Sequence, residues 1–196
     1  MTRVTLLVST ALALSLAACH RGSNTANNTA AASQPKPAAK AAGSQNIATG
    51  LIGDQQFVGA IKAAGMDPVF AGPGPYTVLV PTDAAFAKLS PSARDALMGP
   101  SGKVKLVRLI SHHVLPGTLH TADIVHAIDA HGGKASLATM AGGTLTATRS
   151  GAQIVLTDAG GGTAAIVGTE AKRSNGVIDH IDTVLQPQRY KLPLVN

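Results

Sequence analysis

The chain has 196 residues, a formal net charge of +6, five aromatic residues of the Phe and Tyr types, no tryptophan and one cysteine. Basic residues that are scattered along the chain, with few aromatic rings for stacking on bases, argue against nucleic-acid binding. A single cysteine excludes an internal disulfide. The length suits one domain with additional short segments.

The N-terminal residues are predicted to be an export signal. Arg3 precedes an apolar stretch over residues 4–14, and small residues lead to Cys19. The stretch is shorter than the roughly 20 apolar residues that span a membrane. Residues 16–19, Leu-Ala-Ala-Cys, resemble the lipobox of bacterial lipoproteins, in which the cysteine is lipidated. We therefore expect a lipoprotein signal peptide over residues 1–18 and a lipid anchor on the cysteine. An ordinary cleaved signal with an incidental cysteine is the alternative.

Residues 19–46 are expected to form a flexible tether. Ala, Asn, Ser, Thr, Pro and Lys dominate after the cysteine. Residues 20–46 contain no large apolar residue whose burial could offset the entropy of ordering the chain. A flexible coil of this length reaches roughly 25–30 Å on average. In lipoproteins of enteric bacteria, an aspartate directly after the lipidated cysteine favours retention in the inner membrane. Here His20 occupies that position. The expected location is the bacterial cell envelope, with outer-membrane anchoring favoured.

The remaining residues are expected to form one domain over 47–187 and a C-terminal tail over 188–196. Apolar spacing predicts two short helices within residues 47–65. The stretch GMDPVFAGPGP, residues 65–75, has the composition of a turn. Residues 76–81, YTVLVP, alternate as a strand does, and the strand ends at a proline.

Four further helices are predicted before the strand-rich second half of the chain. The first follows Thr82 or Asp83 as N-cap, and the second follows Ser90 as N-cap with a proline at its first position. A longer helix is predicted over residues 101–114. Its buried stripe is predicted to contain Val104, Val107, Ile110 and Val114. The stretch TADIVHAI, from residue 121, predicts another short helix.

After about residue 134 the apolar period changes to two. The segments ASLATM, TLTATR and QIVLTD are rich in Thr, Val, Ile and Leu, and Gly-Gly or Ser-Gly turns separate them. This pattern is typical of antiparallel hairpins. Residues 164–170 and 175–187 add further strand signals. One strand in the first half and four or five in the second predict an α+β domain.

Three stretches together resemble one family. They are TVLVPTDAAF at residues 77–86, LISHHVLPG at 109–117 and NGVIDHIDTVLQP at 175–187. Their order and spacing are similar to those of the fasciclin domain. The resemblance implies a fasciclin-like wedge of antiparallel strands surrounded by short helices. It also implies adhesion or extracellular interaction rather than catalysis, with an envelope or extracellular protein, glycan or lipid as partner.

The resemblance points to a set of family-motif residues with structural roles: Thr82, Asp83, Phe86, His113, Asn175, Gly176 and Asp182. We expect the threonine and the aspartate of the first motif to accept hydrogen bonds from the amides of the following helix. Its phenylalanine should enter the core, and the motif histidine should hold a loop carbonyl. A catalytic role for the aspartate is the alternative. His112 and Asp179 stand where the family often has tyrosine and histidine, respectively.

The histidines raise the question of a metal site. The candidate ligands are His112, His113, His120, His180 and Asp182. Adjacent histidines point in different directions, whereas zinc ligands are spaced to share a face, so a structural role is favoured for the motif histidine. The sequence has no Gly-x-Ser-x-Gly elbow, and GPSGK at residues 99–103 lacks the spacing of a phosphate loop. We therefore expect no enzyme activity, no metal and no cofactor.

These inferences predict an envelope-anchored, non-catalytic interaction or adhesion module. The alternative is a periplasmic lipoprotein that binds a small ligand or a metal.

Overall fold

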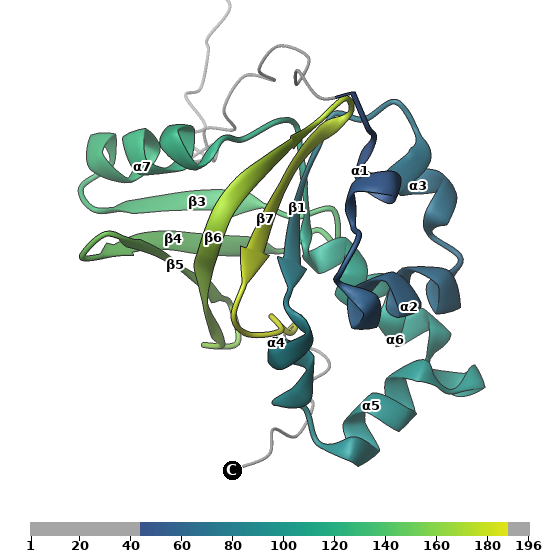
Figure 1. Cartoon of the computed structure of the whole chain (residues 1–196). Helices are drawn as coiled ribbons and strands as arrows, with labels where there is room; N and C mark the ends of the chain where they lie inside the picture. The colour runs from purple at the N-terminus through teal and green to yellow at the C-terminus, as the bar shows by residue number, and fades with distance from the viewer. Residues whose placement is uncertain (1–43, 188–196) are drawn as a thin grey trace, which may run out of the picture. The chain divides into compact units, whose positions relative to one another are not determined.

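A mixed β-sheet is the framework of the domain in the computed structural model, which describes residues 44–187 (Figure 1). Within this part of the chain the strand order is β2-β1-β7-β6-β5-β4-β3. The strands are β1 (Tyr76–Pro81), β2 (Val114–Pro116), β3 (Lys134–Ala138), β4 (Thr144–Ser150), β5 (Gln153–Asp158), β6 (Thr163–Arg173) and β7 (Gly176–Ile181). The predicted signal peptide, most of the tether and the predicted tail lie outside the described residues.

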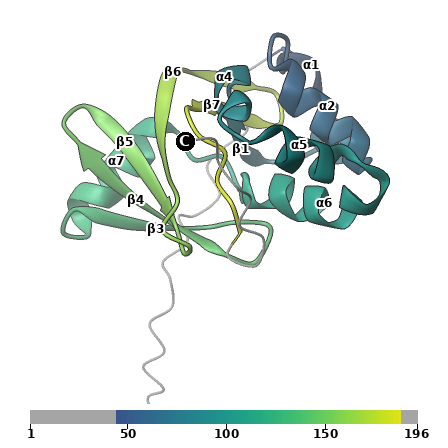
Figure 2. The ribbon, with the colours of Figure 1, turned by 90° about the horizontal axis from the view of Figure 1, so that it is seen from below.

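Short helices accompany the sheet, and most of them come from the first half of the chain. They are α1 (Ile47–Gly50), α2 (Gln55–Ala64), α3 (Asp67–Ala71), α4 (Asp83–Ala87), α5 (Pro91–Met98), α6 (Lys103–His112) and α7 (Thr121–Ala130), with a 3-10 turn at Pro100–Gly102. Figure 2 shows α1, α2, α5 and α6 gathered on one side of the sheet, and α7 on the other side beside β3, β4 and β5. Within residues 44–187, no helix is long and apolar enough to span a membrane.

The sheet is mixed because β1 runs parallel to β7, with Tyr76 opposite Gly176. The other strand pairs are antiparallel. The β1–β7 pair is therefore the exception to the expected antiparallel arrangement within residues 44–187. A parallel pair needs a long connection between its strands, and here most of the domain lies between β1 and β7. The two ends of the sheet also approach each other, since the Met140 amide after β3 donates to the Val114 carbonyl of β2 at 2.8 Å.

Alternation along β1 divides the apolar side chains between two cores. Val78 and Val80 face a helical core, and Leu79 faces a hairpin core on the opposite side. The helical core includes Phe57, Phe70, Phe86, Leu106 and Ile110. The hairpin core includes Ile124, Ile128, Leu145, Leu156 and Ile181. The strand pair β1–β7 therefore lies between two packed layers and is buried on both faces.

Three local predictions differ from the structure. Residues 67–71 form α3 rather than a turn, because Pro68 stands in the first turn of the helix and Phe70 is fully buried. In the predicted stripe of α6, Ile110 is buried as expected, but Val104 is 75% exposed and Val114 belongs to β2. The buried face of α6 instead includes Leu106 and Leu109. The short strand β2 was not predicted, because residues 114–116 carry too few positions to show a period of two.

Candidate functional site

The first family motif forms a corner between β1 and α4. Thr82 is the N-cap of α4, and its hydroxyl accepts a hydrogen bond from the Ala85 amide at 3.2 Å. Asp83 does not cap this helix: its Oδ1 accepts from the Gln56 amide of α2 at 3.0 Å. Phe86 is 5% exposed and lies in the helical core. The motif therefore caps α4 through Thr82 and accepts a hydrogen bond from a free amide at the start of α2 through Asp83. The sequence spacing did not indicate the second contact.

We expect Asp83→Ala to lower the free energy of unfolding by about 1 kcal/mol, because an amide at the start of α2 loses its acceptor. Asp95→Ala is the matched control, since Asp95 is an exposed aspartate on α5. Urea unfolding of the two variants measures the difference. Equal stabilities of the two variants would show that the contact between α4 and α2 contributes nothing.

The second motif places a fully buried histidine at the end of α6. His113 Nδ1 lies 2.8 Å from the Leu109 carbonyl, and its Nε2 lies 3.1 Å from the Leu185 amide. Since a carbonyl only accepts and an amide N–H only donates, Nδ1 carries the proton and the ring is neutral. Burial lowers the pKa of His113 to about 4, although the hydrogen bond to the Leu109 carbonyl opposes this shift. The carbonyl belongs to a helix rather than to a loop, and the loop contact is made to an amide.

The third motif begins with a buried asparagine that joins three segments. Asn175 Oδ1 accepts from the Ile47 amide at 2.8 Å, at the start of α1. Its Nδ2 donates to the Phe70 carbonyl at 2.8 Å and to the Gly72 carbonyl at 2.7 Å, at the end of α3. All three partners are backbone groups far away in the sequence. The side chain therefore fastens two helices to the β6–β7 hairpin.

We expect Asn175→Ala to lower the free energy of unfolding by about 2 kcal/mol, because three backbone groups lose a buried partner. Asn46→Ala is the matched control, since this asparagine caps α1 locally and its contacts with Thr49 are exposed. Denaturant unfolding compares the two. If Asn175→Ala lowers the free energy of unfolding no more than Asn46→Ala does, then Asn175 does not hold the two helices to the β6–β7 hairpin.

The end of the third motif ties β7 to β6. Asp182 Oδ1 accepts from the Ala165 amide at 2.8 Å, and the Asp182 amide donates to the Ala165 carbonyl at 3.1 Å. Lys88 also donates to the Asp182 carbonyl at 2.7 Å. This aspartate, like the other polar residues of the motifs, holds backbone groups of the domain.

Two acidic residues meet beneath the start of α7. Glu170 accepts from the Thr121 amide at 2.7 Å and from His120 Nδ1 at 2.7 Å. Burial raises the pKa of Glu170, but these hydrogen bonds outweigh the effect and leave its pKa below the usual value. Asp179 is 1% exposed, and burial followed by the nearby Glu170 charge raises its pKa to about 6. Its Oδ1 accepts from the Thr121 hydroxyl at 3.2 Å.

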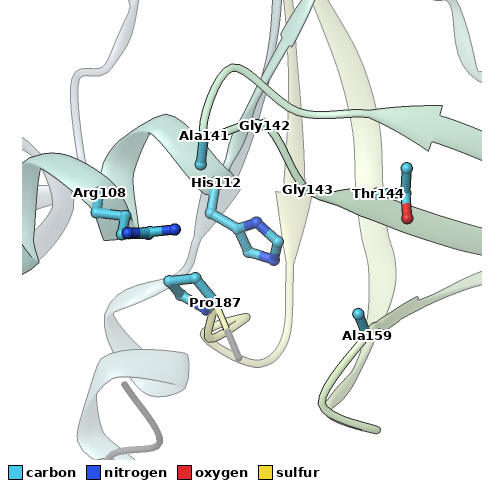
Figure 3. Close-up of a pocket in the computed structure, with 8 residues that line it drawn as sticks. All are labelled: Arg108, His112, Ala141, Gly142, Gly143, Thr144, Ala159 and Pro187. Atoms are coloured by element: carbon cyan, nitrogen blue, oxygen red, sulfur yellow. The ribbon is translucent and has the colours of Figure 1, made fainter. Parts of the chain in front are cut away.

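A cavity of about 160 Å³ lies beside the C-terminal end of α6. Arg108 and His112 approach it from the helix, and the turn between β3 and β4 forms the opposite wall (Figure 3). Ala159 and Pro187 complete its lining. His112 is 3% exposed, and its Nε2 has no hydrogen-bond partner among the described residues.

A comparison with models of protein families shows to which family the chain belongs. The family model described as the fasciclin domain matches residues 54–187, which include all three motifs. The chain belongs to the fasciclin family. Fasciclin domains are generally interaction or adhesion modules and generally non-catalytic.

Relatives and a solved structure agree with this assignment. "Protein sll1483" of Synechocystis is 31% identical over 147 residues, which cover 75% of this chain and 71% of that protein. The pig transforming growth factor-beta-induced protein ig-h3 is 28% identical over 67% of this chain, which spans 17% of that protein. A fasciclin domain pair from the insect cell adhesion molecule Fasciclin I has a TM-score of 0.53 at 20% identity, over 68% of this chain and 45% of the other. The expected α+β, fasciclin-like fold is confirmed.

The candidate metal ligands of this fasciclin domain have partners of their own. His120 contacts Glu170, and His180 Nε2 lies 3.1 Å from Asp54 Oδ2. The rings of His112 and His113 stand at 90° with centroids 6.3 Å apart. Within residues 44–187, no group of three or more His, Cys, Asp or Glu side chains is placed to hold a metal ion.

Sequence reasoning missed the roles of three carboxylates of the fasciclin domain, of which Asp158 and Asp179 are buried and Glu170 is partly buried. Asp158 precedes three glycines, and an aspartate before glycines is a turn signal; its Oδ1 accepts from the Gly160 and Gly162 amides at 2.8 Å. Asp179 interrupts an apolar strand, which could have marked it as unusual. Glu170 carries no such signal, because its partners at the start of α7 lie about fifty residues earlier in the chain.

Proposed function

We propose that this protein is a non-catalytic interaction or adhesion module of the fasciclin type, anchored by lipid to the bacterial cell envelope. The observation that carries the proposal is the match of the fasciclin model to residues 54–187. Interaction or adhesion is the general role of this domain. The envelope location rests on the resemblance of Leu-Ala-Ala-Cys19 to a lipobox.

The contacts of the motif residues support a binding module rather than an enzyme. Thr82, Asp83, His113, Asn175 and Asp182 each hydrogen-bond to backbone groups of the domain. A catalytic residue must instead reach a substrate or a second catalytic side chain. The motif thus stabilises the fold, and binding is assigned to the exposed surface that the fold carries.

The relatives favour adhesion as the form of interaction. The solved domain pair comes from an insect cell adhesion molecule, and this chain spans 45% of it. Adhesion by the present chain is therefore a proposal that extends a property of a larger protein. The proposed partner is an envelope or extracellular protein, glycan or lipid.

Anchoring by lipid makes a prediction at one residue. Cys19→Ser should abolish incorporation of a radiolabelled fatty acid in a bacterial host, because the thiol is the acceptor of the lipid. The unchanged chain, expressed in parallel, is the positive control. Labelling that persists in the variant would contradict lipidation at this position.

A small-ligand role is the second candidate function, and the cavity beside His112 favours it. The two functions differ in what they require. Adhesion requires many copies on a surface and gains strength from their number, whereas a small ligand binds equally well to a single soluble copy.

The tether provides a test of the proposed adhesion. Cells that carry the anchored chain should adhere or cluster more than cells that carry Cys19→Ser. Deleting most of residues 20–43 should reduce adhesion while the melting temperature of the domain stays unchanged, because the deleted residues lie before the fasciclin domain. Adhesion that is the same for all three chains would contradict the proposal.

A further inference from the structure

The start of α7 rests on two carboxylates from neighbouring strands of the sheet. Glu170 lies on β6, and Asp179 lies on β7. The Thr121 hydroxyl lies 3.3 Å from Glu170 Oε2 and 3.2 Å from Asp179 Oδ1. The Thr121 amide also donates to Glu170 Oε2 at 2.7 Å. One hydroxyl therefore stands between two acidic side chains at the first residue of the helix.

The hydroxyl of Thr121 cannot serve both carboxylates when both are ionised. It has a single proton to donate, and an ionised carboxylate can only accept. If the hydroxyl donates to Glu170, its oxygen faces Asp179 Oδ1 with no proton between them, and the reverse choice leaves the same conflict at Glu170. A proton on Asp179 removes the conflict, because its carboxyl then donates to the hydroxyl, which donates to Glu170.

The second oxygen of Asp179 indicates the same protonation state. Asp179 is 1% exposed, and its Oδ2 has no hydrogen-bond partner among residues 44–187. Its neighbour on β1 is Leu79 of the hairpin core, so the carboxyl lies on the same apolar face of the sheet. Burial of an ionised carboxylate costs far more than burial of a neutral acid. The surroundings therefore favour the protonated form.

The two carboxylates differ in how readily they take up a proton. Burial raises the pKa of Glu170, but the hydrogen bonds from Thr121 and His120 together leave it below the usual value. Burial, and next the charge of Glu170, raise the pKa of Asp179 to about 6. Asp179 is therefore the member of the pair that is protonated first as the pH falls.

Among residues 44–187, the other titratable groups that act on Asp179 are two histidines. His180 follows it on β7 and His120 precedes α7, and both lower the pKa of Asp179 without outweighing its burial. Each histidine has an acidic partner, since His180 Nε2 lies 3.1 Å from Asp54 Oδ2 and His120 Nδ1 lies 2.7 Å from Glu170 Oε1. The balance around Asp179 therefore still favours the protonated acid.

The start of α7 is held separately from the turn that precedes it. In that turn, the Leu119 amide donates to the Thr77 hydroxyl at 2.8 Å. Further along the helix, Ile124 and Ile128 pack in the hairpin core. Loss of the contacts at residue 121 can therefore separate the first turn of α7 from β6 and β7 while the preceding turn stays in place.

We propose that Asp179, Thr121 and Glu170 form a pH-sensitive latch that fastens the start of α7 to the sheet while Asp179 is protonated. When Asp179 loses its proton to solvent, two negative charges face a single hydroxyl proton, and the start of α7 opens more often. Opening uncovers apolar side chains of the hairpin core. The latch is independent of the proposed adhesion.

The direction of the pH dependence follows from the pKa of Asp179. This pKa is about 6 in the closed form, whereas an exposed aspartate has a value of 3.8. The closed form therefore binds more protons between these values and is favoured in acid. Opening should increase about tenfold between pH 5 and pH 7.5 and should change little above that range.

Native-state hydrogen exchange of the chain from residue 20 onward, which contains every described residue, tests the latch. The amides of Thr121 and Ile124 report on the first turn of α7, and the Leu79 amide, which donates to the His113 carbonyl, reports on global unfolding. After correction for intrinsic exchange, the α7 amides should show the tenfold change at low denaturant concentrations that leave their opening unaffected. If they exchange only together with Leu79, through global unfolding, the proposal is overturned.

Two variants assign the roles within the latch. Asp179→Asn resembles the protonated acid, because its amide group can donate to the Thr121 hydroxyl. This variant should open at pH 7.5 as rarely as the unchanged chain does at pH 5. Thr121→Val keeps the backbone amide but removes the hydroxyl, so it should open about fivefold more often at pH 5. Opening of Asp179→Asn that still increases between pH 5 and pH 7.5 would overturn the proposal.

Two further variants separate Asp179 from its charged neighbours. Asp123→Asn removes another carboxylate from the first turn of α7, one that accepts from the His120 amide and does not contact Asp179. His120→Gln removes the imidazole beside Glu170. Both variants should keep the pH dependence of opening, whatever their opening at any single pH. A pH dependence that is lost in His120→Gln and kept in Asp179→Asn would assign the effect to the histidine and contradict the latch.

Discussion

Replacing Gly176 by alanine should prevent the fasciclin domain from reaching its native state. Gly176 is the first residue of β7 and has a φ of +151°, a conformation that residues with a side chain rarely adopt. A Cβ at this position would overlap the carbonyl oxygen of Tyr76, its partner on the parallel strand β1. The obstacle is backbone, so no side-chain rotation removes it. We expect a loss of more than about 4 kcal/mol, an effect at the upper end of the range for single substitutions.

Gly133→Ala separates the two causes of this effect. Gly133 also has a positive φ, +89°, but nothing lies within 4 Å of the position of its Cβ. It should therefore cost about 1–2 kcal/mol, the strain of the backbone conformation alone. Circular dichroism and thermal unfolding measure both variants. A folded Gly176→Ala variant that melts within a few degrees of Gly133→Ala would show that β1 and β7 do not approach as closely as described.

Two buried groups should change the pH dependence of stability in opposite directions. The pKa of His113 falls from 6.5 to about 4 on folding, so the unfolded chain binds more protons between these values. Its contribution to stability is therefore lost as the pH falls from about 6.5 to 4. The pKa of Asp179 rises from 3.8 to about 6, so the folded chain binds more protons in that window. Its carboxyl destabilises the domain as the pH rises from about 4 to 6.

Single variants should reveal these opposing contributions between pH 4 and 6. Asp179→Asn should steepen the loss of stability in acid by about 1.4 kcal/mol per pH unit, the value for one proton. His113→Gln should reduce that loss by a similar slope, even if the variant is less stable at every pH. Each slope difference corresponds to about 3 kcal/mol over the full window.

Denaturant unfolding at several pH values measures the two slopes. Glu170 is coupled to Asp179, and His112 is coupled to His113, so each slope difference reports the titration of the coupled pair and not of one residue alone. His131→Gln is the control for the histidine, since His131 is exposed at the end of α7. If stability changes with pH at the same slope in Asp179→Asn and in the unchanged chain, the pKa of Asp179 is not raised.

Local signals in the sequence were sufficient for the elements that depend on local chemistry. Thr82 caps α4 and Ser90 caps α5, with Pro91 at the first helical position, and these signals can be read within four residues. The hairpins formed by β3, β4 and β5 follow from alternation and glycine turns. The distribution of strand signals predicted the α+β class, and the family resemblance predicted the fasciclin-like fold, which the comparisons confirm.

The features that sequence reasoning missed depend on contacts between distant segments. Asp83 binds α2 rather than its own helix, because the Gln56 amide lies beside it only after folding. The exposed face of α6 bears Val104 because neighbouring helices, not apolarity alone, decide which side is buried. The raised pKa of Asp179 results from burial beside Glu170, a residue on the neighbouring strand.

The most direct test of the proposed function is the binding of beads that carry the chain from residue 20 onward at graded density. Multivalent adhesion predicts that retention on bacterial envelope fragments, or clustering of the beads themselves, rises steeply with density, while the soluble chain competes weakly. Beads that carry an unrelated protein of matched positive charge control for attraction to acidic polymers. Retention and clustering no greater than those of the control beads at every density would contradict the proposal that this fasciclin domain is an adhesion module.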